Sequence, residues 1–470
     1  MKKIKLRSKE WFDNPKDPGL TAIYLERYLN YGLKRKDLQS GKPIIGIAQS
    51  GSDLSPCNRH ILDLSKNIKK GIVNAGGVPM EFPTHPIQET GKRPTAALDR
   101  NLSYLSLVEV LYGYPLDGVV LTTGCDKTTP AALMAAATVN IPSIILSGGP
   151  MLDGHYKGQK AGSGTIIWEA RKLYSKGEID YDQFMDMATA SSPSVGHCNT
   201  MGTASTMNSI AEALGMSLPG CAIIPAPYPE RKKISYKTGQ RIVNMVRENL
   251  TPSKIMTKKA FENAVVVASA IGGSSNATTH LLAIAKHMGI KFDLSNWQKL
   301  GHKIPLLVDC QPAGKYLMEG FYKAGGIPAV MKELIKNKKL NTKVKTVTGK
   351  NLGQNLKSKI KVNSKVIKTF KKNLSQNAGF LVLRGNFFNS AIMKTSVISD
   401  EFKKRYLSDP DKPNSFICKA AVFEGPEDYH KRINSKKLNI DEKSILIIRG
   451  CGPIGLSLIH ISEPTRRAII

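Results

Sequence analysis

Apolar runs and helical periodicity alternate along the first half of the chain and predict an α/β fold. Short β-branched runs of the kind that form buried strands are each followed by a segment with apolar residues at helical spacing. The predicted strands are residues 42–48, 78–82, 117–123 and 142–147. The predicted helices between them are residues 60–75, 95–112 and 130–137. We therefore expect a doubly wound N-terminal domain with a parallel sheet.

The pattern changes past residue 375. Short predicted strands follow one another without helix-length partners, at residues 378–385, 420–423 and 444–450. This arrangement is typical of a β-rich domain. We expect a catalytic α/β domain over residues 1–375 and part of a β-rich domain over residues 376–455.

A lysine-rich segment, residues 331–373, precedes this change and contains Glu333 as its only acid. The formal net charge of the chain is +31, which by itself suggests an acidic partner such as nucleic acid. The basic residues of the segment are mostly lysine with few aromatic residues between them, so the stacking and bidentate contacts of nucleic-acid binders are missing. We interpret the segment as a solvated surface or connector, and a basic, cluster-free binding protein stays open as an alternative.

The composition of the chain indicates how many domains it can form and in which cellular compartment it lies. Its 470 residues, 41% of them hydrophobic, suffice for two or three domains with real cores. No apolar run is long enough to span a bilayer, and the first residues lack the apolar centre of a signal peptide. Seven cysteines, an odd number, do not suggest a secreted disulfide framework. We expect a cytoplasmic protein with reduced thiols and no membrane partner.

Three cysteines lie on three separate polar or glycine-rich loops. Cys57 follows the first predicted strand, Cys125 follows the third, and Cys198 lies just before a predicted helix that begins near Ala204. Since the carboxyl ends of parallel strands meet at one edge of a sheet, these loops can converge there. The loop after the second strand adds one carboxylate, Glu89.

The side chains on these loops suit metal chemistry. Three thiolates on one centre leave an open position, as a Lewis-acid iron requires, and their spacing is too wide for a zinc ribbon. The carboxylates of Glu89 and Asp126 are hard ligands that suit magnesium. The alternatives are that each cysteine is a small buried hydrophobe, that Asp126 caps a helix, and that Lys127 pairs with Asp126.

Three segments carry a resemblance to a known family. Residues 55–60 (Ser-Pro-Cys-Asn-Arg-His), 125–132 (Cys-Asp-Lys-Thr-Thr-Pro-Ala-Ala) and 196–207 resemble the signature segments of the dihydroxy-acid and phosphogluconate dehydratases. The match runs in register from about Leu6 to Gly455. Four further segments resemble the branch that dehydrates pentonates, namely residues 11–15, 24–28, 85–94 and 148–154.

The resemblance implies a set of site residues. By it, the iron–sulfur ligands are Cys57, Cys125 and Cys198, with a [2Fe-2S] cluster expected rather than [4Fe-4S]. Magnesium ligands are expected at Glu89 and Asp126. Lys127 matches a lysine that is carbamylated in relatives. By the same resemblance, Lys127 and Cys125 would take part in catalysis. Residues 270–280 open a helix and resemble a family segment near the active site, although a glycine-rich helix entry can hold any anion.

The implied reaction is the dehydration of a 2,3-dihydroxy carboxylate, such as L-arabinonate or D-xylonate, to a 2-oxo-3-deoxy acid. Water is lost and no redox change occurs, so the cluster acts as a Lewis acid. The alternative substrate class is that of the dihydroxy-acid dehydratases of branched-chain amino-acid synthesis. The family resemblance also implies a homo-oligomer, a dimer or tetramer.

The end of the sequence departs from the family pattern. In the family a swivelling β-barrel domain continues with a metal-binding glutamate and a serine that acts as the general base. Residues 456–470 instead resemble a translated sequencing-library adapter, so we expect a non-native tail there. By this interpretation the chain is truncated at its carboxyl end and turns over little substrate.

Overall fold

The computed structural model describes residues 5–30, 32–87, 97–386 and 390–450. At its centre lies a sheet of four parallel strands in the order β2-β1-β3-β4. The strands are β1 (Ile44–Gln49), β2 (Val78–Pro83), β3 (Gly118–Thr123) and β4 (Ser143–Ser147). All four lie where apolar runs predict them. Every residue of β1, β3 and β4 is buried, which requires cover on both faces of the sheet.

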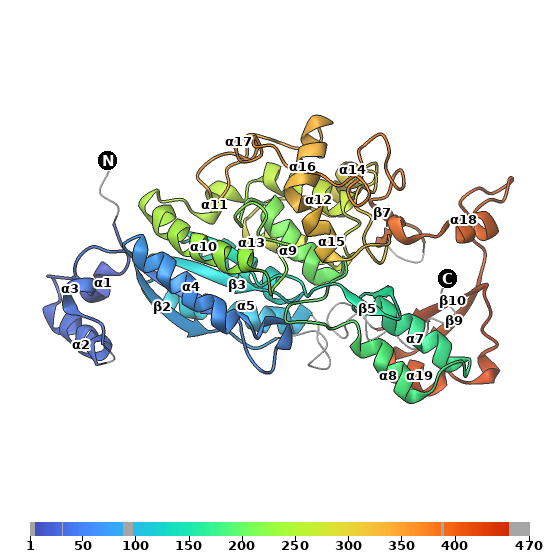
Figure 1. Ribbon diagram of the computed structural model, residues 1–470, viewed down its shortest axis with the longest axis horizontal. Helices are drawn as coiled ribbons and strands as arrows, with labels where there is room; N and C mark the ends of the chain where they lie inside the picture. Colours follow the sequence, from blue (N-terminus) through green and yellow to red (C-terminus); the bar gives the residue numbers. More distant parts are fainter. Residues whose placement is uncertain (1–4, 31, 88–96, 387–389, 451–470) are drawn as a thin grey trace.

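Two helix pairs supply that cover (Figure 1). In the first pair, α4 packs on β1 and β2, and α10 packs on β3 and β4. In the second pair, α6 packs on β3 and β4, and α5 packs against α6. The helices are α4 (Ile61–Asn74), α5 (Ala97–Gly113), α6 (Thr128–Val139) and α10 (Pro229–Arg247). Glycines let α4 and α10 touch, because a Cβ at Gly71 would collide with the backbone of Tyr236. The doubly wound prediction is confirmed.

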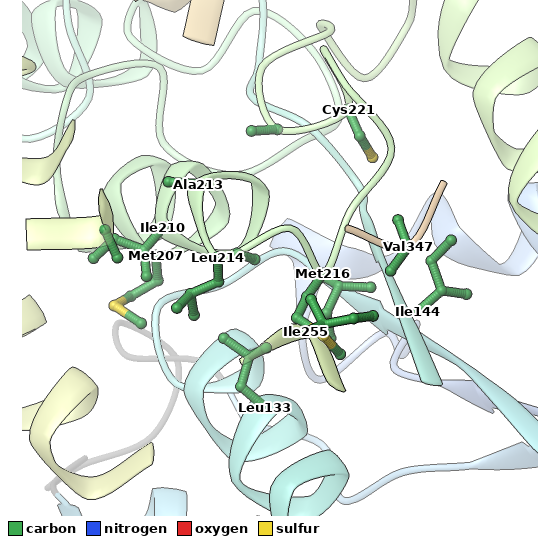
Figure 2. Packing of buried hydrophobic residues seen from close by; sticks show 14 of the residues in the cluster. Leu133, Ile144, Met207, Ile210, Ala213, Leu214, Met216, Cys221, Ile255 and Val347 are labelled. Atoms are coloured by element: carbon green, nitrogen blue, oxygen red, sulfur yellow. The ribbon is translucent and has the colours of Figure 1, made fainter. Parts of the chain in front are cut away.

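A helical layer packs beyond α6. Its helices are α9 (Thr203–Ala213), α11 (Pro252–Ile255), α12 (Lys258–Ala270), α13 (Asn276–His287), α14 (Leu294–Gly301), α15 (Met318–Lys323) and α16 (Gly326–Lys336). Figure 2 shows the apolar contact between this layer and the sheet domain, with Leu133 of α6 near Met207 of α9 and Leu214, the residue that follows α9. Because α6 and α9 each begin just after a cysteine loop, this core fixes two of the predicted site loops relative to one another.

The remaining elements of the N-terminal part are short or peripheral. They are α1 (Lys9–Phe12), α2 (Pro18–Leu29), α3 (Arg35–Leu38), the 3-10 turn η1 (Pro56–Asn58), the hairpin β5 (Gly154–Tyr156) and β6 (Gln159–Ala161), α7 (Thr165–Ser175) and α8 (Tyr181–Thr189). The buried carboxylate of Asp117 ties the start of α1 to the sheet. It accepts hydrogen bonds from the backbone and hydroxyl of Ser8 and from the backbone of Ile44, at 2.7–3.1 Å.

The lysine-rich segment, residues 331–373, packs on the helical layer and does not form a free connector. It includes the end of α16 and the short helix α17 (Leu352–Asn355). Apolar side chains of the segment are buried, among them Val344, Val347 and Ile367, while lysines such as Lys343 lie exposed. Most of the single valines and isoleucines among the lysines are thus core residues, although Val362 is exposed, and the charge lies on a solvated surface, as predicted.

The carboxyl-terminal part forms two small sheets. One is antiparallel, β7 (Phe380–Leu383) with β8 (Ala391–Lys394), and one is parallel, β9 (Lys419–Phe423) with β10 (Ser444–Ile448). The short strands lie where predicted, but the expectation that no helix accompanies them is wrong. Between them lie η2 (Thr395–Val397), α18 (Asp400–Tyr406), α19 (Gly425–Arg432) and η3 (Lys436–Leu438). Helix α19 buries only Tyr429, so it carries almost no apolar periodicity.

No helix within the described ranges combines the length and the apolar character needed to cross a membrane.

Candidate functional site

The predicted site loops lie at the point where the strand order of the sheet reverses. The chain passes from β1 to β2 on one side and then to β3 on the other, so the loops after β1 and β3 diverge to opposite faces and leave a crevice at the carboxyl ends of the strands. Cys57 lies in the loop after β1, and Cys125 lies two residues past β3. These placements agree with the prediction from the sequence.

Asn58 joins the first two cysteine loops. Its buried side chain accepts a hydrogen bond of 3.0 Å from the backbone N–H of Cys125. Gly124 permits this contact, because a Cβ at that position would collide with Oδ1, the side-chain oxygen of Asn58. The pKa of the Cys57 thiol lies below its usual value because the Cys125 side chain hydrogen-bonds to it, although burial acts in the opposite direction. A lowered pKa favours the thiolate, the form that binds metals.

The third cysteine loop is tied to the same edge through the segment that follows β4. The backbone of His197 pairs with this segment, donating to the Gly149 carbonyl at 3.0 Å and accepting from Met151 at 2.9 Å. His60, three residues past Cys57, lies 2.8 Å through Nε2 from the carbonyl oxygen of Gly148. The loop of Cys198 and the loop of Cys57 therefore contact neighbouring residues of one segment.

A second asparagine fixes the Cys125 loop from the side of α9. The Asn208 amide donates to the Gly124 carbonyl at 3.0 Å, and its oxygen accepts from the hydroxyls of Thr123 and Thr129, both at 3.1 Å. Sequence reasoning missed both Asn58 and Asn208. A signal was present for Asn208, because a polar side chain on the apolar face of a predicted helix needs buried partners.

Arg231 fixes the segment after β4 and was also not predicted. It is fully buried on α10, and its guanidinium donates to the carbonyl oxygens of Ser147 at 2.6 Å, Cys221 at 2.9 Å and Ile224. Burial lowers the pKa of this guanidinium. The buried thiol of Cys221 lies 3.7 Å from Nη1 of the same guanidinium.

Asp126 and Lys127 form a buried ion pair on the same loop. Lys127 Nζ lies 2.9 Å from Asp126 Oδ2, and the side chains are 6% and 4% exposed. The Cys125 thiol lies 3.3 Å from the other oxygen of Asp126. This pair is the alternative that the sequence left open for Lys127. Glu89, the second predicted magnesium ligand, lies outside the described residues.

Three helices begin within the predicted site segments. Helix α6 begins directly after Lys127, α9 begins after Gly202, and α13 begins after Ser275. The last two meet through Thr203, whose hydroxyl lies 2.9 Å from that of Ser274 and accepts from the Asn276 amide at 3.0 Å. Helix amino termini carry partial positive charge, so the site favours an anionic ligand.

His280, on the second turn of α13, belongs to the same neighbourhood. It is 4% exposed, and burial lowers its pKa to about 3, with the charges of Arg100 and Lys127 acting in the same direction. The imidazole is therefore neutral at physiological pH. The sequence placed residues 270–280 near the site but did not single out this histidine.

The side chains at this edge offer both soft and hard donor atoms. Among the described residues, no group of three His, Cys, Asp or Glu side chains is arranged around one metal position. A cluster distributes its thiolate ligands over several irons, so such a compact group is not required. The contact between Cys57 and Cys125, the lowered thiol pKa and the tethered Cys198 loop supply the soft donors. The carboxylate of Asp126 supplies a hard donor beside them.

Two family models match most of the chain. The model for the N-terminal part of the dihydroxy-acid/6-phosphogluconate dehydratases matches residues 42–355, and the model for the C-terminal part matches residues 365–461. Members of this family use an iron–sulfur cluster and Mg²⁺.

Curated relatives are similar over nearly the whole chain. D-xylonate dehydratase of Caulobacter vibrioides is 58% identical over 451 residues, which cover 96% of this chain and 76% of that protein. L-arabinonate dehydratase of Rhizobium leguminosarum is 43% identical over 454 residues, with the same coverage. Dihydroxy-acid dehydratase of Caldanaerobacter subterraneus is 36% identical over 435 residues, which cover 91% of this chain and 76% of that protein.

Proposed function

Because the chain belongs to the dihydroxy-acid/6-phosphogluconate dehydratase family, we propose that it dehydrates a five-carbon sugar acid, D-xylonate or L-arabinonate. The observation that carries this proposal is the junction of the Cys57 and Cys125 loops at the sheet crevice, with a buried Asp126–Lys127 pair beside it. Among substrates, identity favours pentonates, since the pentonate relatives are 58% and 43% identical and the dihydroxy-acid dehydratase is 36% identical. The product is a 2-oxo-3-deoxy acid.

In this proposal the cluster is held by Cys57, Cys125 and Cys198, and it is of the [2Fe-2S] type. When bound, it supplies a Lewis-acid iron that makes a hydroxyl a better leaving group. The chain keeps the surroundings dry and rigid, because Asn58 and Asn208 clamp the Cys125 loop from two sides. A dry site strengthens each electrostatic contact to the substrate.

Asp126 and Glu89 are the proposed magnesium ligands, and Lys127 is the proposed site of carbamylation. The position of Lys127 supports this role, since its buried amine lies directly beside Asp126, the other proposed metal ligand of this loop. The protonated amine would lose a proton, and the neutral amine would then add to CO2 and release a second proton, so that a carbamate with a negative charge replaces the positive charge. The ion pair with Asp126 would then be lost, and both side chains would present oxygen atoms to the metal.

The amino termini of α6, α9 and α13 suit the carboxylate of the sugar acid. With the acid held there, removal of the proton from carbon 2 and departure of the hydroxyl from carbon 3 release one water. The resulting enol becomes the 2-oxo-3-deoxy acid by moving a proton to carbon 3. Because no electrons are gained or lost overall, the reaction needs no redox partner.

The domain boundary near residue 375 is likewise a proposal. Backbone bridges join Leu306 to Ser375 and Val308 to Ile367, and strand β7 also packs on α14, so contacts with the catalytic part continue a few residues past 375. The homo-oligomer also stays a prediction.

A direct comparison of substrates tests the proposed activity. The chain, purified without oxygen and supplied with Mg²⁺, should form a 2-oxo acid from D-xylonate or L-arabinonate faster than from 2,3-dihydroxy-3-methylbutanoate. A preference for the branched substrate would assign it to the amino-acid branch. Failure to bind or convert any of the three acids, with the cluster present, would contradict the proposal.

A further inference from the structure

His280 carries a buried N–H whose orientation is set by a neighbouring arginine. Arg100 of α5 lies with Nη1 3.0 Å from His280 Nδ1, and both side chains are buried. A guanidinium has only donors, so Nδ1 must accept this hydrogen bond through its lone pair. The single proton of the imidazole is then on Nε2. This assignment follows from the contact alone.

The Nε2 atom of His280 is buried and has no hydrogen-bond partner in the described part of the chain. Buried donors without partners are rare in folded proteins because their desolvation is not compensated. An unpaired donor at this place is explained if its acceptor arrives with a ligand. Helix α13, which carries His280, packs on α6, the helix that begins directly after Lys127, and the charges of Asp126 and Lys127 act on the imidazole. The donor therefore lies in the neighbourhood of the proposed substrate site.

The helix that carries His280 is held firmly. Two turns further along α13, His287 Nδ1 lies 3.0 Å from the hydroxyl of Thr138 on α6, and its ring packs on that of Tyr104 of α5 at 4.6 Å. Both α5 and α13 pack against α6, the helix that begins directly after Lys127. The direction of the His280 N–H is therefore fixed before any ligand binds, which favours recognition.

We propose that His280 is a substrate-binding residue whose Nε2–H donates a hydrogen bond to an oxygen of the sugar acid, and that Arg100 is a positioning residue that fixes this tautomer. The proposal rests on the proposed function and deepens it, since it names a contact within the same site. It requires that binding of the acid depends on a donor at this one atom.

Two isosteric substitutions of His280 separate its two nitrogens. In His280→Asn the amide oxygen can accept from Arg100 at the place of Nδ1, but no atom remains at the place of Nε2. In His280→Gln an amide N–H can take the place of Nε2. Titration calorimetry with D-xylonate and Mg²⁺ should show affinity about tenfold to hundredfold weaker for His280→Asn and near wild type for His280→Gln.

The control is His155→Gln, the same substitution at an exposed histidine of β5, which should leave affinity unchanged. Arg100→Met should weaken binding and Arg100→Lys should restore part of it. Melting temperatures verify folding, and if His280→Asn does not fold, His280→Met replaces it as a donor-free variant. Wild-type affinity in a folded donor-free variant would overturn the inference and leave the proposed function standing. Absence of sugar-acid binding in the wild-type chain would overturn both.

Discussion

The central sheet and the carboxyl-terminal parallel pair use the same connection, strand to helix to parallel strand, with opposite degrees of burial. Every residue of β3 and β4 is buried, and helices cover both faces. In β9 only Phe423 is buried, and in β10 only Ser444 is buried. The comparison shows that topology does not determine how deeply strands are buried. The proposed chemistry lies at the fully buried sheet, where side chains can be held in fixed positions.

The largest difference between the two regions should appear in the free energy of unfolding when a glycine is replaced by a larger residue. Gly71→Val forces side-chain atoms into the backbone of α10, so we expect a loss of about 3 kcal/mol or more in the free energy of unfolding. Gly385 lies in the carboxyl-terminal part, and a Cβ added there would have no atom within 4 Å. Gly385→Ala should therefore change the free energy of unfolding by less than about 0.5 kcal/mol. Urea denaturation measures both. Equal effects would show that the two regions are equally well packed.

A smaller difference should appear on removing a carboxylate. Asp117→Ala leaves two buried backbone N–H groups and the Ser8 hydroxyl without their acceptor, which should cost about 2 to 3 kcal/mol. Asp441→Ala removes a carboxylate that also accepts from a backbone N–H and a serine hydroxyl, but in an exposed position. Water can replace those contacts, so a cost below about 1 kcal/mol is expected. Thermal unfolding of both variants compares them, and a larger loss for Asp441→Ala would reverse the distinction.

The smallest of these effects is a difference in pH dependence. Burial raises the pKa of Glu212 on α9 to about 7, whereas the Arg432 hydrogen bond lowers the pKa of Asp428, a partly exposed residue of α19, to about 2. A raised carboxyl pKa contributes stability that is present below its unfolded value of 4.5 and lost as the pH rises through 7. A lowered carboxyl pKa, as at Asp428, contributes stability that is lost as the pH falls from 3.8 through 2.

The two substitutions should therefore act at opposite ends of the pH range. Between pH 5 and pH 8, the wild-type chain should lose about 2 kcal/mol of unfolding free energy relative to Glu212→Gln. Asp428→Asn should follow the wild type throughout that range and differ from it only below about pH 4. Urea denaturation at each pH gives the two curves. A Glu212→Gln curve parallel to that of the wild type would contradict the burial effect.

The same contrast explains what could be predicted from the sequence. The strands β1, β3 and β4 are continuous apolar runs between glycines and helical segments, a strong local signal, and Cys57 and Cys125 follow from the rule for strand ends. Helix α19 was missed because one buried tyrosine makes no periodic pattern. Asn58, Asn208 and Arg231 act through contacts between segments distant in sequence, which periodicity does not reveal.

One measurement tests most directly whether the cysteine loops at the sheet crevice hold the catalytic cluster. The chain is purified and reconstituted without oxygen, and its iron, its acid-labile sulfide and its visible spectrum are recorded beside those of two serine variants. We predict a coloured protein that contains iron and sulfide in stoichiometric amounts, loses them in Cys125→Ser and retains them in Cys418→Ser. A colourless, iron-free chain after reconstitution, or equal iron in both variants, would contradict the assignment.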